Sequence, residues 1–468
     1  MKNHAQMWST SYDIIIVGAG VVGSSLAHAL SNVSIQRSKP LRICLLERSL
    51  SEPDRIVGEL LQPGGIMALK KLGLESCLEG IGAVPTYGYC VVLDGKPVQI
   101  PYPNGHEGRG FHHGRFIQAL REKAKKATCV EVVEATVSEL IECPLTGRIL
   151  GVRATRKLAA GDAEPVEKEP FFADLTVVAD GCFSNFRNLV MGKAGIKPAT
   201  RSHFVGVVLE DANLPIDKHG TVVLVRGQGP VLLYQIAEHE TRMLVDLKEP
   251  VPSDIKDHIL TQINPQLPSA LQVPVERALA NDRIRRMPNS WLPPAEQGGH
   301  LSKEGVILVG DSWNMRHPLT GGGMTVAFND VVLLTDMLVG YKSSQIGSKS
   351  LVVALYDLFG AEDPSLEVLR VGCFKYFELG GNCIREPVTL LAAIEQAPFM
   401  LFRHFFAVAL YSIWVLFTHP RQIGVDKGKP IFAKPRPDEY PLLFLKSVHV
   451  FWTACVVFLP LMWTEIRP

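Results

Sequence analysis

The sequence has almost no excess charge of either sign. Its 468 residues carry 48 Lys and Arg against 47 Asp and Glu, which leaves a formal net charge of +1. Proteins that bind nucleic acid through the phosphate backbone present a basic surface, and this composition shows no such footprint. We therefore expect no nucleic acid among its partners.

Paired cysteine motifs are also missing. The nine cysteines are scattered, their number is odd, and no CxxC pair occurs. This argues against a disulfide framework and favours reduced thiols facing the cytosol. We find no metal cluster and no Ser-His-Asp arrangement, and residues 1–11 are too polar and too short for a signal peptide. A second nucleotide-binding βαβ unit is absent as well.

What the sequence does contain, near its start, is a strand, a glycine turn, a helix and a second strand. The apolar run Asp13–Val17 is typical of a strand buried on both faces, and it ends at the turn Gly18–Gly23. Ser24–Leu30 then has helical spacing, and a second apolar run, Leu41–Leu46, ends on Glu47. These are the parts of a dinucleotide-binding βαβ unit.

Each polar or small residue of this unit has an expected role. Gly18 allows the tight turn, Gly20 lets the backbone approach a pyrophosphate, and Gly23 lets the helix pack closely on the strand. The phosphates would lie at the helix N-terminus, where unpaired amides favour negative charge. Glu47 can accept hydrogen bonds from both hydroxyls of an adenosine ribose.

The middle of the chain is rich in predicted strands. Tyr87–Leu93 and Lys96–Ile100 are expected to form a hairpin that turns at Asp94-Gly95, a dipeptide suited to a two-residue turn. More strands are expected between residues 130 and 180 and between residues 203 and 247. Together they indicate a second, β-rich lobe inserted into the nucleotide fold, since 468 residues exceed what one compact core usually needs.

After this lobe the chain is expected to return to the first one. Pro288–Pro294 is interpreted as a linker, and Gly305–Asp311 as another buried strand that ends on a Gly-Asp pair. The run Gly321–Gly323 then opens a helix expected from Met324 to about Leu338. From Leu351 onward the chain is predicted to be helical.

The C-terminus holds two apolar helical runs, Phe405–Phe417 and Val448–Trp463, joined by the basic connector Thr418–Pro441. Each run is shorter than the roughly 20 residues a helix needs to cross a bilayer. One interpretation is a pair of core helices in a soluble protein. We favour a monotopic hairpin that dips into one leaflet, because both runs are long and rich in aromatic residues.

Three separated motifs resemble those of FAD-dependent monooxygenases of the aromatic-hydroxylase type. They are the glycine turn, the stretch Asp180–Arg187 with its Asp-Gly start, and Gly310-Asp311 followed by Pro318 and the glycines up to Gly323. Asp311 at a strand end can accept hydrogen bonds from ribityl or ribose hydroxyls. Each motif is weak alone, but three in this order, each after a buried strand, are specific.

Longer blocks narrow the resemblance to the squalene epoxidase (squalene monooxygenase) family, in particular its eukaryotic members. The blocks are Asp54–Gly65, Phe111–Phe116, Ser202–Gly206, Arg286–Pro288, Asn314–Thr325 and Cys373–Phe377. The resemblance covers about Asp13 to Trp463. The stretch from about Leu338 to Leu351 is shorter than the family pattern, which leaves the packing around Phe359 open.

The resemblance implies a set of site residues. FAD contacts beyond the glycine turn are expected at Glu47, Arg48, Arg55, Leu60, Arg115, Val132 or Val133, Asp180, Asp311, Gly323 and Met324. The substrate side is expected at Pro318, Leu319, Phe359, Phe374, Leu390, His404 and Phe405. Tyr89 and Gln62 are expected to pair by a hydrogen bond near the inner end of the pocket, as the residues closest to catalysis. His112, His113 and His317 are expected to make structural hydrogen bonds.

The resemblance also implies a domain plan with an α/β fold. A Rossmann-like FAD-binding domain is expected in residues 12–86, 106–200 and 298–340, and a β-rich substrate domain in 87–105 and 201–297. Residues 341–468 would form a C-terminal helical region with membrane-associated helices at about 399–418 and 442–463.

The implied activity is FAD-dependent epoxidation of squalene to (S)-2,3-oxidosqualene with O2, through a flavin C4a-hydroperoxide, in sterol and ergosterol biosynthesis. Squalene has no polar handle, so its binding must come from apolar area at about 25 cal/mol per Å². The expected partners are an NADPH-cytochrome reductase as electron donor and membrane lipid, without any metal. The expected location is the cytosolic face of the endoplasmic reticulum membrane, with lipid droplets and microsomes as further sites.

Two alternatives remain open at this point. A prenyl-chain reductase of the same fold would share the glycine motifs but need not share Arg316–Thr325. A non-enzymatic prenyl-protein escort has a related fold without flavin, and the presence of Asp311, Arg115 and Asp180-Gly181 argues against it.

Overall fold

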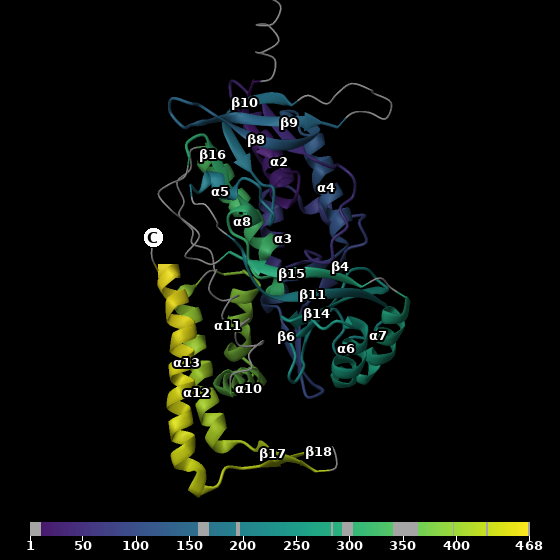
Figure 1. The fold of residues 1–468 in the computed structure, drawn as a ribbon, viewed down its shortest axis with the longest axis vertical. Helices are drawn as coiled ribbons and strands as arrows, with labels where there is room; N and C mark the ends of the chain where they lie inside the picture. The colour runs from purple at the N-terminus through teal and green to yellow at the C-terminus, as the bar shows by residue number, and fades with distance from the viewer. Residues whose placement is uncertain are drawn as a thin grey trace, which may run out of the picture. The chain divides into compact units, whose positions relative to one another are not determined.

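The computed structural model describes residues 11–157, 168–192, 197–281, 284–292, 303–339, 364–395, 397–426 and 429–466 (Figure 1). The chain folds into two compact units. The first unit draws on residues 1–83, 109–200 and 290–345, and the second on residues 84–108, 201–289 and 346–468.

The first unit combines a mainly parallel sheet with helices. Its strands are β1 (Ser11–Val17), β2 (Ile43–Glu47), β3 (Leu60–Leu61), β7 (Gly108–Gly110), β8 (Val130–Glu142), β9 (Ile149–Arg156), β10 (Glu169–Val178) and β16 (Val306–Leu308). Its helices are α2 (Val21–Ser34), α3 (Pro63–Lys71), α4 (His113–Lys125), α5 (Arg187–Val190) and α8 (Gly323–Val339), with short 3-10 turns at Glu75–Leu78, Gly310–Ser312 and Pro318–Thr320.

The large sheet of this unit is built around β1. Strands β2 and β10 flank β1 and run parallel to it, while β8 and β16 continue the parallel sheet on either side. Strand β9 pairs antiparallel with both β8 and β10. The parallel strands and the glycine turn that leads into α2 confirm the predicted α/β class with a Rossmann-like unit.

Both faces of this sheet are buried, which explains the continuous apolar runs in its strands. Ile14 and Ile16 face a core shared with α2, α3, α4 and α8, and Ile15 and Val17 face a second core on the other side. Figure 1 shows α2 and α4 along the sheet formed by β8, β9 and β10. A strand covered on both faces cannot alternate polar and apolar residues, so the sequence pattern follows from this layering.

The second unit contains a seven-stranded sheet and most of the C-terminal helices. Its strands are β4 (Val84–Thr86), β5 (Gly88–Leu93), β6 (Lys96–Pro101), β11 (Ala199–Glu210), β12 (His219–Leu224), β13 (Val231–Gln235), β14 (Glu240–Lys248), β15 (Arg285–Trp291), β17 (Arg421–Asp426) and β18 (Lys429–Ala433). Its helices are α6 (Ile255–His258), α7 (Ser269–Asn281), α10 (Pro364–Glu378), α11 (Asn382–Leu391), α12 (Pro398–Thr418) and α13 (Tyr440–Ile466), with short π or 3-10 turns at Pro103–Gly105, Ile259–Ile263, Asn264–Gln266 and Pro437–Glu439.

The large sheet has the order β15-β11-β14-β13-β12-β5-β6. The hairpin of β5 and β6 turns at Asp94-Gly95, both with positive φ, which confirms that prediction. The chain returns to the first unit within Pro288–Pro294, as predicted, but the segment is not an irregular linker where the structure describes it, because Arg285–Trp291 forms β15. Strand β15 lies at the edge of the sheet, and an edge strand tolerates Pro288 because one side of it needs no amide donors.

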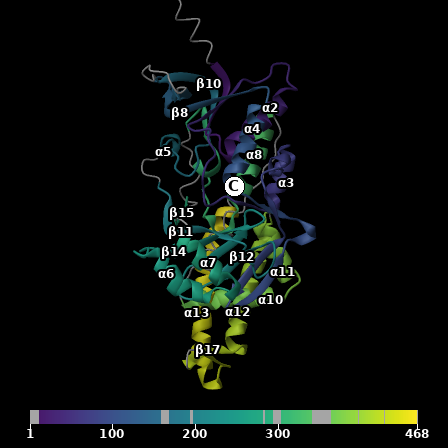
Figure 2. The ribbon, with the colours of Figure 1, turned by 90° about the vertical axis from the view of Figure 1, so that its right-hand side faces the viewer.

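The two C-terminal helices compare differently with expectation. Helix α12, with 21 residues, nearly coincides with the helix expected at about 399–418, whereas α13, with 27 residues, is longer than the helix expected at about 442–463. Among the described residues, only the helix at Phe399–Thr418 is long and apolar enough to cross a membrane. The two helices run side by side and are joined through the β17–β18 hairpin (Figures 1 and 2). The prediction that the chain is helical from Leu351 onward is therefore wrong at these two strands, where Gly424 and Pro430 disfavour a helix.

The glycine turn generates a stability prediction. A Cβ at Gly23 would lie 1.8 Å from the Gly18 carbonyl oxygen, whereas a Cβ at Gly20 meets nothing within 4 Å. We expect Gly23→Ala to lower the free energy of unfolding by at least about 1–3 kcal/mol, because the helix must move off the strand. Gly20→Ala is the matched control and should unfold like the parent in the absence of nucleotide.

Thermal or denaturant unfolding of the two variants, monitored by circular dichroism, measures the difference. Equal stability of both variants would show that α2 can move off β1 at no cost, against this prediction.

Candidate functional site

Four parallel strands of the first unit end at one edge of the sheet. Val17 of β1 is paired with Leu46 of β2 and with Val178 of β10, and Val178 is paired with Leu308 of β16. Loops that are far apart in the chain therefore start side by side. In open α/β sheets such an edge is where ligands bind, because the loops there are free to carry polar groups.

The glycine turn lies at the centre of this edge. Gly18 has φ +101°, and a Cβ there would lie 2.6 Å from the Ala179 carbonyl oxygen, so only glycine fits. Helix α2 begins at Val21, and no side chain caps its first turn. The space around Gly20 is open, so backbone amides at this helix N-terminus are accessible to an anion. Gly18, Gly20 and Gly23 thus have the geometry expected for their roles.

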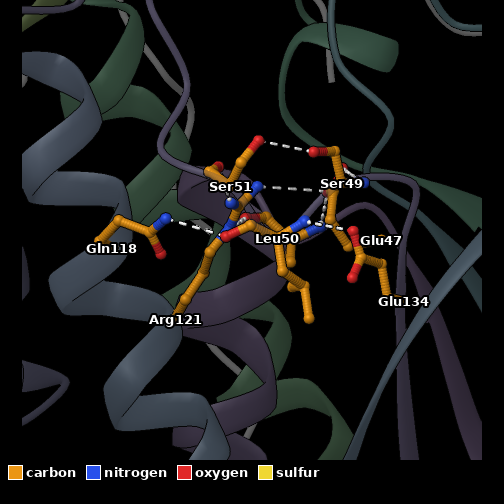
Figure 3. Close-up of polar contacts among 8 residues, drawn as sticks. Glu47, Ser49, Leu50, Ser51, Gln118, Arg121 and Glu134 are labelled. Carbon is orange, nitrogen blue, oxygen red and sulfur yellow. Dashed lines mark hydrogen bonds and ion pairs between the residues drawn. The ribbon is translucent and has the colours of Figure 1, made fainter. Parts of the chain in front are cut away.

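Glu47 ends β2 and is held by the glycine turn and a buried arginine (Figure 3). Its Oε2 accepts from the Ala19 amide at 2.7 Å, and its Oε1 accepts from the Ser49 amide at 3.2 Å. The Arg121 guanidinium of α4 lies 3.6 Å from the same carboxylate. The acid is fixed beside the turn, where it can meet a ribose.

Arg121 is a residue that sequence reasoning missed. It is buried, and it donates through Nε to the Ala19 carbonyl at 2.9 Å and through Nη1 to the Ser51 carbonyl at 2.9 Å. Figure 3 shows Arg121 and Gln118 reaching from α4 to the segment that follows Glu47. The available signal was an arginine on the apolar face of α4, among Phe116, Ile117, Leu120 and Ala124.

A second buried arginine, Arg187, joins the other two motif loops. Its Nε donates to the Ser312 carbonyl at 2.7 Å, and its Nη2 donates to the carbonyls of Asp311 at 2.9 Å and Cys182 at 3.1 Å. The Ser312 hydroxyl in turn donates to the Val178 carbonyl at 2.8 Å. Arg187 therefore joins the loop after Asp180 and the loop at Asp311 through hydrogen bonds.

The two acids of these loops carry unusual electrostatics. Burial raises the pKa of the Asp311 carboxyl, and the guanidinium groups of Arg55, Arg187 and Arg316 act in the opposite direction. Burial also raises the pKa of Asp180, whose Oδ2 accepts from the Asn185 amide at 3.0 Å. Asp180 Oδ1 is buried and has no hydrogen-bond partner among the described atoms. Such an acceptor fits a ligand hydroxyl or ring N–H.

The other predicted site residues of the first unit range from fully buried to exposed. Gln62 is fully buried and precedes α3, and a Cβ at Gly321 would lie 3.5 Å from its Nε2. Leu60, Leu319 and Met324 are buried, Pro318 is half-buried, and no atom lies within 4 Å of a Cβ at Gly323. Val132 lies on β8 opposite Leu45. Arg48, Arg55 and Arg115 are exposed, with Arg115 Nη1 3.5 Å from the Ile81 carbonyl.

His113 and His317 make structural hydrogen bonds, as expected. His113 Nδ1 lies 2.9 Å from the Gly58 carbonyl, so it carries a proton and donates. Burial, followed by Arg55 and Arg121, lowers the pKa of His113 to about 4. His317 Nδ1 accepts from the Leu319 amide at 3.3 Å. His112 precedes α4 as its N-terminal flanking residue.

The second unit holds the other predicted substrate residues. Tyr89 and Phe374 belong to one apolar cluster, and Leu390 and Phe405 belong to another. The Tyr89 ring packs edge-on against Tyr102 at 5.4 Å between centroids. His404 is buried on α12. Phe359 lies outside the described residues, and the expected Tyr89–Gln62 bond joins residues of different units and stays a prediction.

Solved flavoproteins share this fold. A probable FAD-dependent monooxygenase from Pseudomonas aeruginosa, pqsL, matches with a TM-score of 0.56 and 19% identity over 85% of this chain and 99% of its own. A flavoprotein/dehydrogenase from Cytophaga hutchinsonii matches with a TM-score of 0.64 and 14% identity over 86% of this chain and 99% of its own. Because the sequence identities are only 19% and 14%, these matches show a shared fold alone.

Sequence relatives are much closer. The chain is 42% identical to squalene epoxidase erg1 of Aspergillus fumigatus, over 97% of this chain and 93% of that protein. It is 39% identical to squalene monooxygenase of Mus musculus over 98% and 78%, and 40% identical to squalene epoxidase 1 of Arabidopsis thaliana over 96% and 86%. The squalene epoxidase family model matches residues 172–350 and 339–427. The chain belongs to the squalene epoxidase family.

Proposed function

We propose that this protein is an FAD-dependent squalene monooxygenase that uses O2 to convert squalene to 2,3-oxidosqualene in sterol biosynthesis. The single observation that carries the proposal is the meeting of the three flavoprotein motifs at one sheet edge, in a chain of the squalene epoxidase family. Bound FAD would supply the oxygen-transfer chemistry, which no side chain can provide.

The donor and acceptor set of the first unit fits FAD. The open space at Gly20 and the uncapped start of α2 suit a pyrophosphate, and Glu47 suits the adenosine ribose. Asp311, near Arg55, and the unpartnered Oδ1 of Asp180, near Arg187, offer acceptors that suit the ribityl chain and flavin ring. Gly323 and Met324 at the start of α8 leave room for the flavin to approach the backbone. We extend the assignment to Arg48, Leu60, Arg115 and Val132 by family resemblance.

The substrate side is proposed to be apolar. Squalene has no polar group, so its binding depends on burying hydrocarbon at about 25 cal/mol per Å². The apolar clusters around Phe374 and around Leu390 and Phe405 supply such surface in the second unit, and Pro318 and Leu319 supply it in the first. Tyr89 and Gln62 are proposed to border the reacting end, where a dry site protects the activated cofactor from water.

We further propose a membrane location on the cytosolic face of the endoplasmic reticulum, with an NADPH-cytochrome reductase as electron donor. Support for the membrane comes from exposed apolar side chains on the two C-terminal helices: Leu410, Trp414, Leu442, Leu445, Trp452 and Val456. Helices with such exposed surface lie in the interfacial region of a bilayer when they do not cross it. Support for the reductase is the single glycine-turn unit in the sequence, which leaves no second site for a nicotinamide cofactor.

The direct test of the function is turnover. Purified protein with FAD, a cytochrome reductase, NADPH, O2 and squalene should form 2,3-oxidosqualene, measured by mass spectrometry. Omission of the reductase is the control and should remove the product. A flavin-loaded protein that forms no epoxide under these conditions would refute the proposed substrate.

A second prediction concerns the cofactor. Asp311→Asn removes the charge near Arg55 and keeps the side-chain shape, so we expect FAD affinity to fall about 10- to 150-fold, from the loss of about 1.5–3 kcal/mol of charge-assisted hydrogen bonding. The exposed Asp336 on α8 offers a control, Asp336→Asn. Flavin absorbance after gel filtration gives occupancy, and full occupancy of the Asp311→Asn variant would contradict the assignment.

A third prediction concerns the membrane. Replacing Leu442, Leu445 and Trp452 together by Gln should weaken partitioning into vesicles about 100-fold or more, because each exposed side chain can bury apolar area worth about 1.5–3 kcal/mol. Leu145→Gln, at a highly exposed position in the first unit, is the control. Vesicle flotation measures the effect. Unchanged flotation of the triple variant would place the membrane contact elsewhere.

A further inference from the structure

A buried histidine in the apolar helix α12 is the feature that the proposed function leaves without a chemical role. His404 lies among Phe402, Phe405 and Phe406 in the sequence, and its side chain is only 8% exposed. A polar ring in such a helix must find hydrogen-bond partners on its neighbours or lose stability. Both ring nitrogens of His404 have a hydrogen-bond partner.

The two partners come from two other helices. The Tyr376 hydroxyl of α10 lies 2.9 Å from His404 Nδ1, and the Glu386 Oε2 of α11 lies 2.6 Å from His404 Nε2. A carboxylate only accepts, so Nε2 carries the proton and donates to Glu386. In the neutral ring Nδ1 is then the acceptor for the Tyr376 hydroxyl. One imidazole therefore connects α10, α11 and α12.

Glu386 also has a second cation beside it. Arg403, which precedes His404 in the chain, donates through Nη2 to the same Glu386 oxygen. The Arg403 side chain is 64% exposed, whereas that of Glu386 is only 15% exposed. The bond from His404 is thus the buried contact of Glu386, and the pair with Arg403 is its solvent-facing contact, worth little by comparison.

Helix α11 is a short element between two turns. Gly380 and Gly381 precede it with φ +71° and +56°, and Ala393 follows it with φ +52°. Its Leu390 packs with Leu401 of α12, and Phe405 packs on the same cluster. The buried Glu386–His404 bond crosses the same seam between α11 and α12. Val388 of α11 and Ala392 just after it pack in the apolar cluster around Phe374, so side-chain contacts hold α11 in place on that side as well.

We propose that Glu386 is a positioning residue for the apolar substrate: through His404 it holds α11 against α12 and so shapes the seam that Leu390 and Phe405 line. This rests on the proposed function, in which Leu390 and Phe405 contact squalene. Glu386 itself contacts no reacting atom. Its role is to orient His404 and the Tyr376 hydroxyl, so that no polar group turns toward the hydrocarbon.

The test compares Glu386→Leu with two other variants. Glu386→Gln keeps an oxygen that can accept from His404 Nε2. Arg403→Met removes the exposed ion pair and the longer 3.4 Å contact of Arg403 Nη2 with His404 Nε2. With the reductase-coupled assay, we expect Glu386→Leu to raise the KM for squalene about 10-fold, the effect of losing a buried hydrogen-bond acceptor, with kcat and FAD content close to those of the parent. Glu386→Gln and Arg403→Met should keep a KM near the parental value.

Hydrogen exchange of the α11 amides tests the contact without any substrate. Faster exchange in Glu386→Leu, but not in Glu386→Gln or Arg403→Met, is expected. Unchanged exchange in Glu386→Leu would overturn the proposal. Equal changes of KM, FAD content and melting temperature in Glu386→Leu and Glu386→Gln would also overturn it, because they would indicate a purely structural role. If the parent protein turns over no squalene, the proposed function fails, and the exchange data still decide whether Glu386 holds α11.

Discussion

Parallel pairing of β1 with β2 and β10, and of β10 with β16, is the constraint on which the candidate site depends. Because parallel strands end on the same side of a sheet, the register Leu46–Val17–Val178–Leu308 brings their four following loops together. The glycine turn, Glu47, Asp180 and Asp311 are neighbours for this reason alone. A slip of one residue in any strand would exchange the side chains packed in the two cores and displace its loop from the site.

Two buried arginines hold the loops at this edge. A guanidinium group is costly to bury unless it is paired or hydrogen-bonded, and here backbone carbonyls of separate loops accept from both arginines. Arg121 ties the glycine turn to the segment after Glu47, and Arg187 ties the Asp180 loop to the Asp311 loop. Loops fixed in this way need little reorganisation when a cofactor binds, which favours a tight and specific site.

The second unit is proposed to supply apolar surface for a substrate without polar groups. Its sheet and helices offer apolar clusters, and buried polar side chains such as Ser412 and His404 bond to backbone carbonyls or to other side chains. The Tyr376–His404–Glu386 chain is the clearest case, because three helices share one imidazole and leave neither ring nitrogen free. Helix α12 and the helix α13 that packs on it also carry exposed apolar side chains, which suit a lipid surface. The proposed substrate surface and the proposed membrane contact thus both involve the second unit.

The sequence by itself determined the local elements, because their signals act within a few residues. The apolar run before Gly18, the steric need for glycine in the turn and the Asp94-Gly95 hairpin are properties of short segments, and the structure confirms each of them. Glu47 and Asp311 could be recognised as site candidates for the same reason, since each lies at the end of a predicted strand. Family blocks extended the site to residues such as Arg55, Phe374 and His404, whose roles remain predictions.

Only the tertiary structure decided the long-range partners. Arg121 and Arg187 bind carbonyls 70 and 125 residues away, and no local pattern specifies such a pairing. Pro288 could be a strand residue only because β15 lies at a sheet edge. Helix α12 continues through Arg403 and His404 because Glu386, from another helix, satisfies both. Hydrophobic periodicity reports which face of an element is buried, whereas the partner that satisfies a buried polar group is set by the assembled fold.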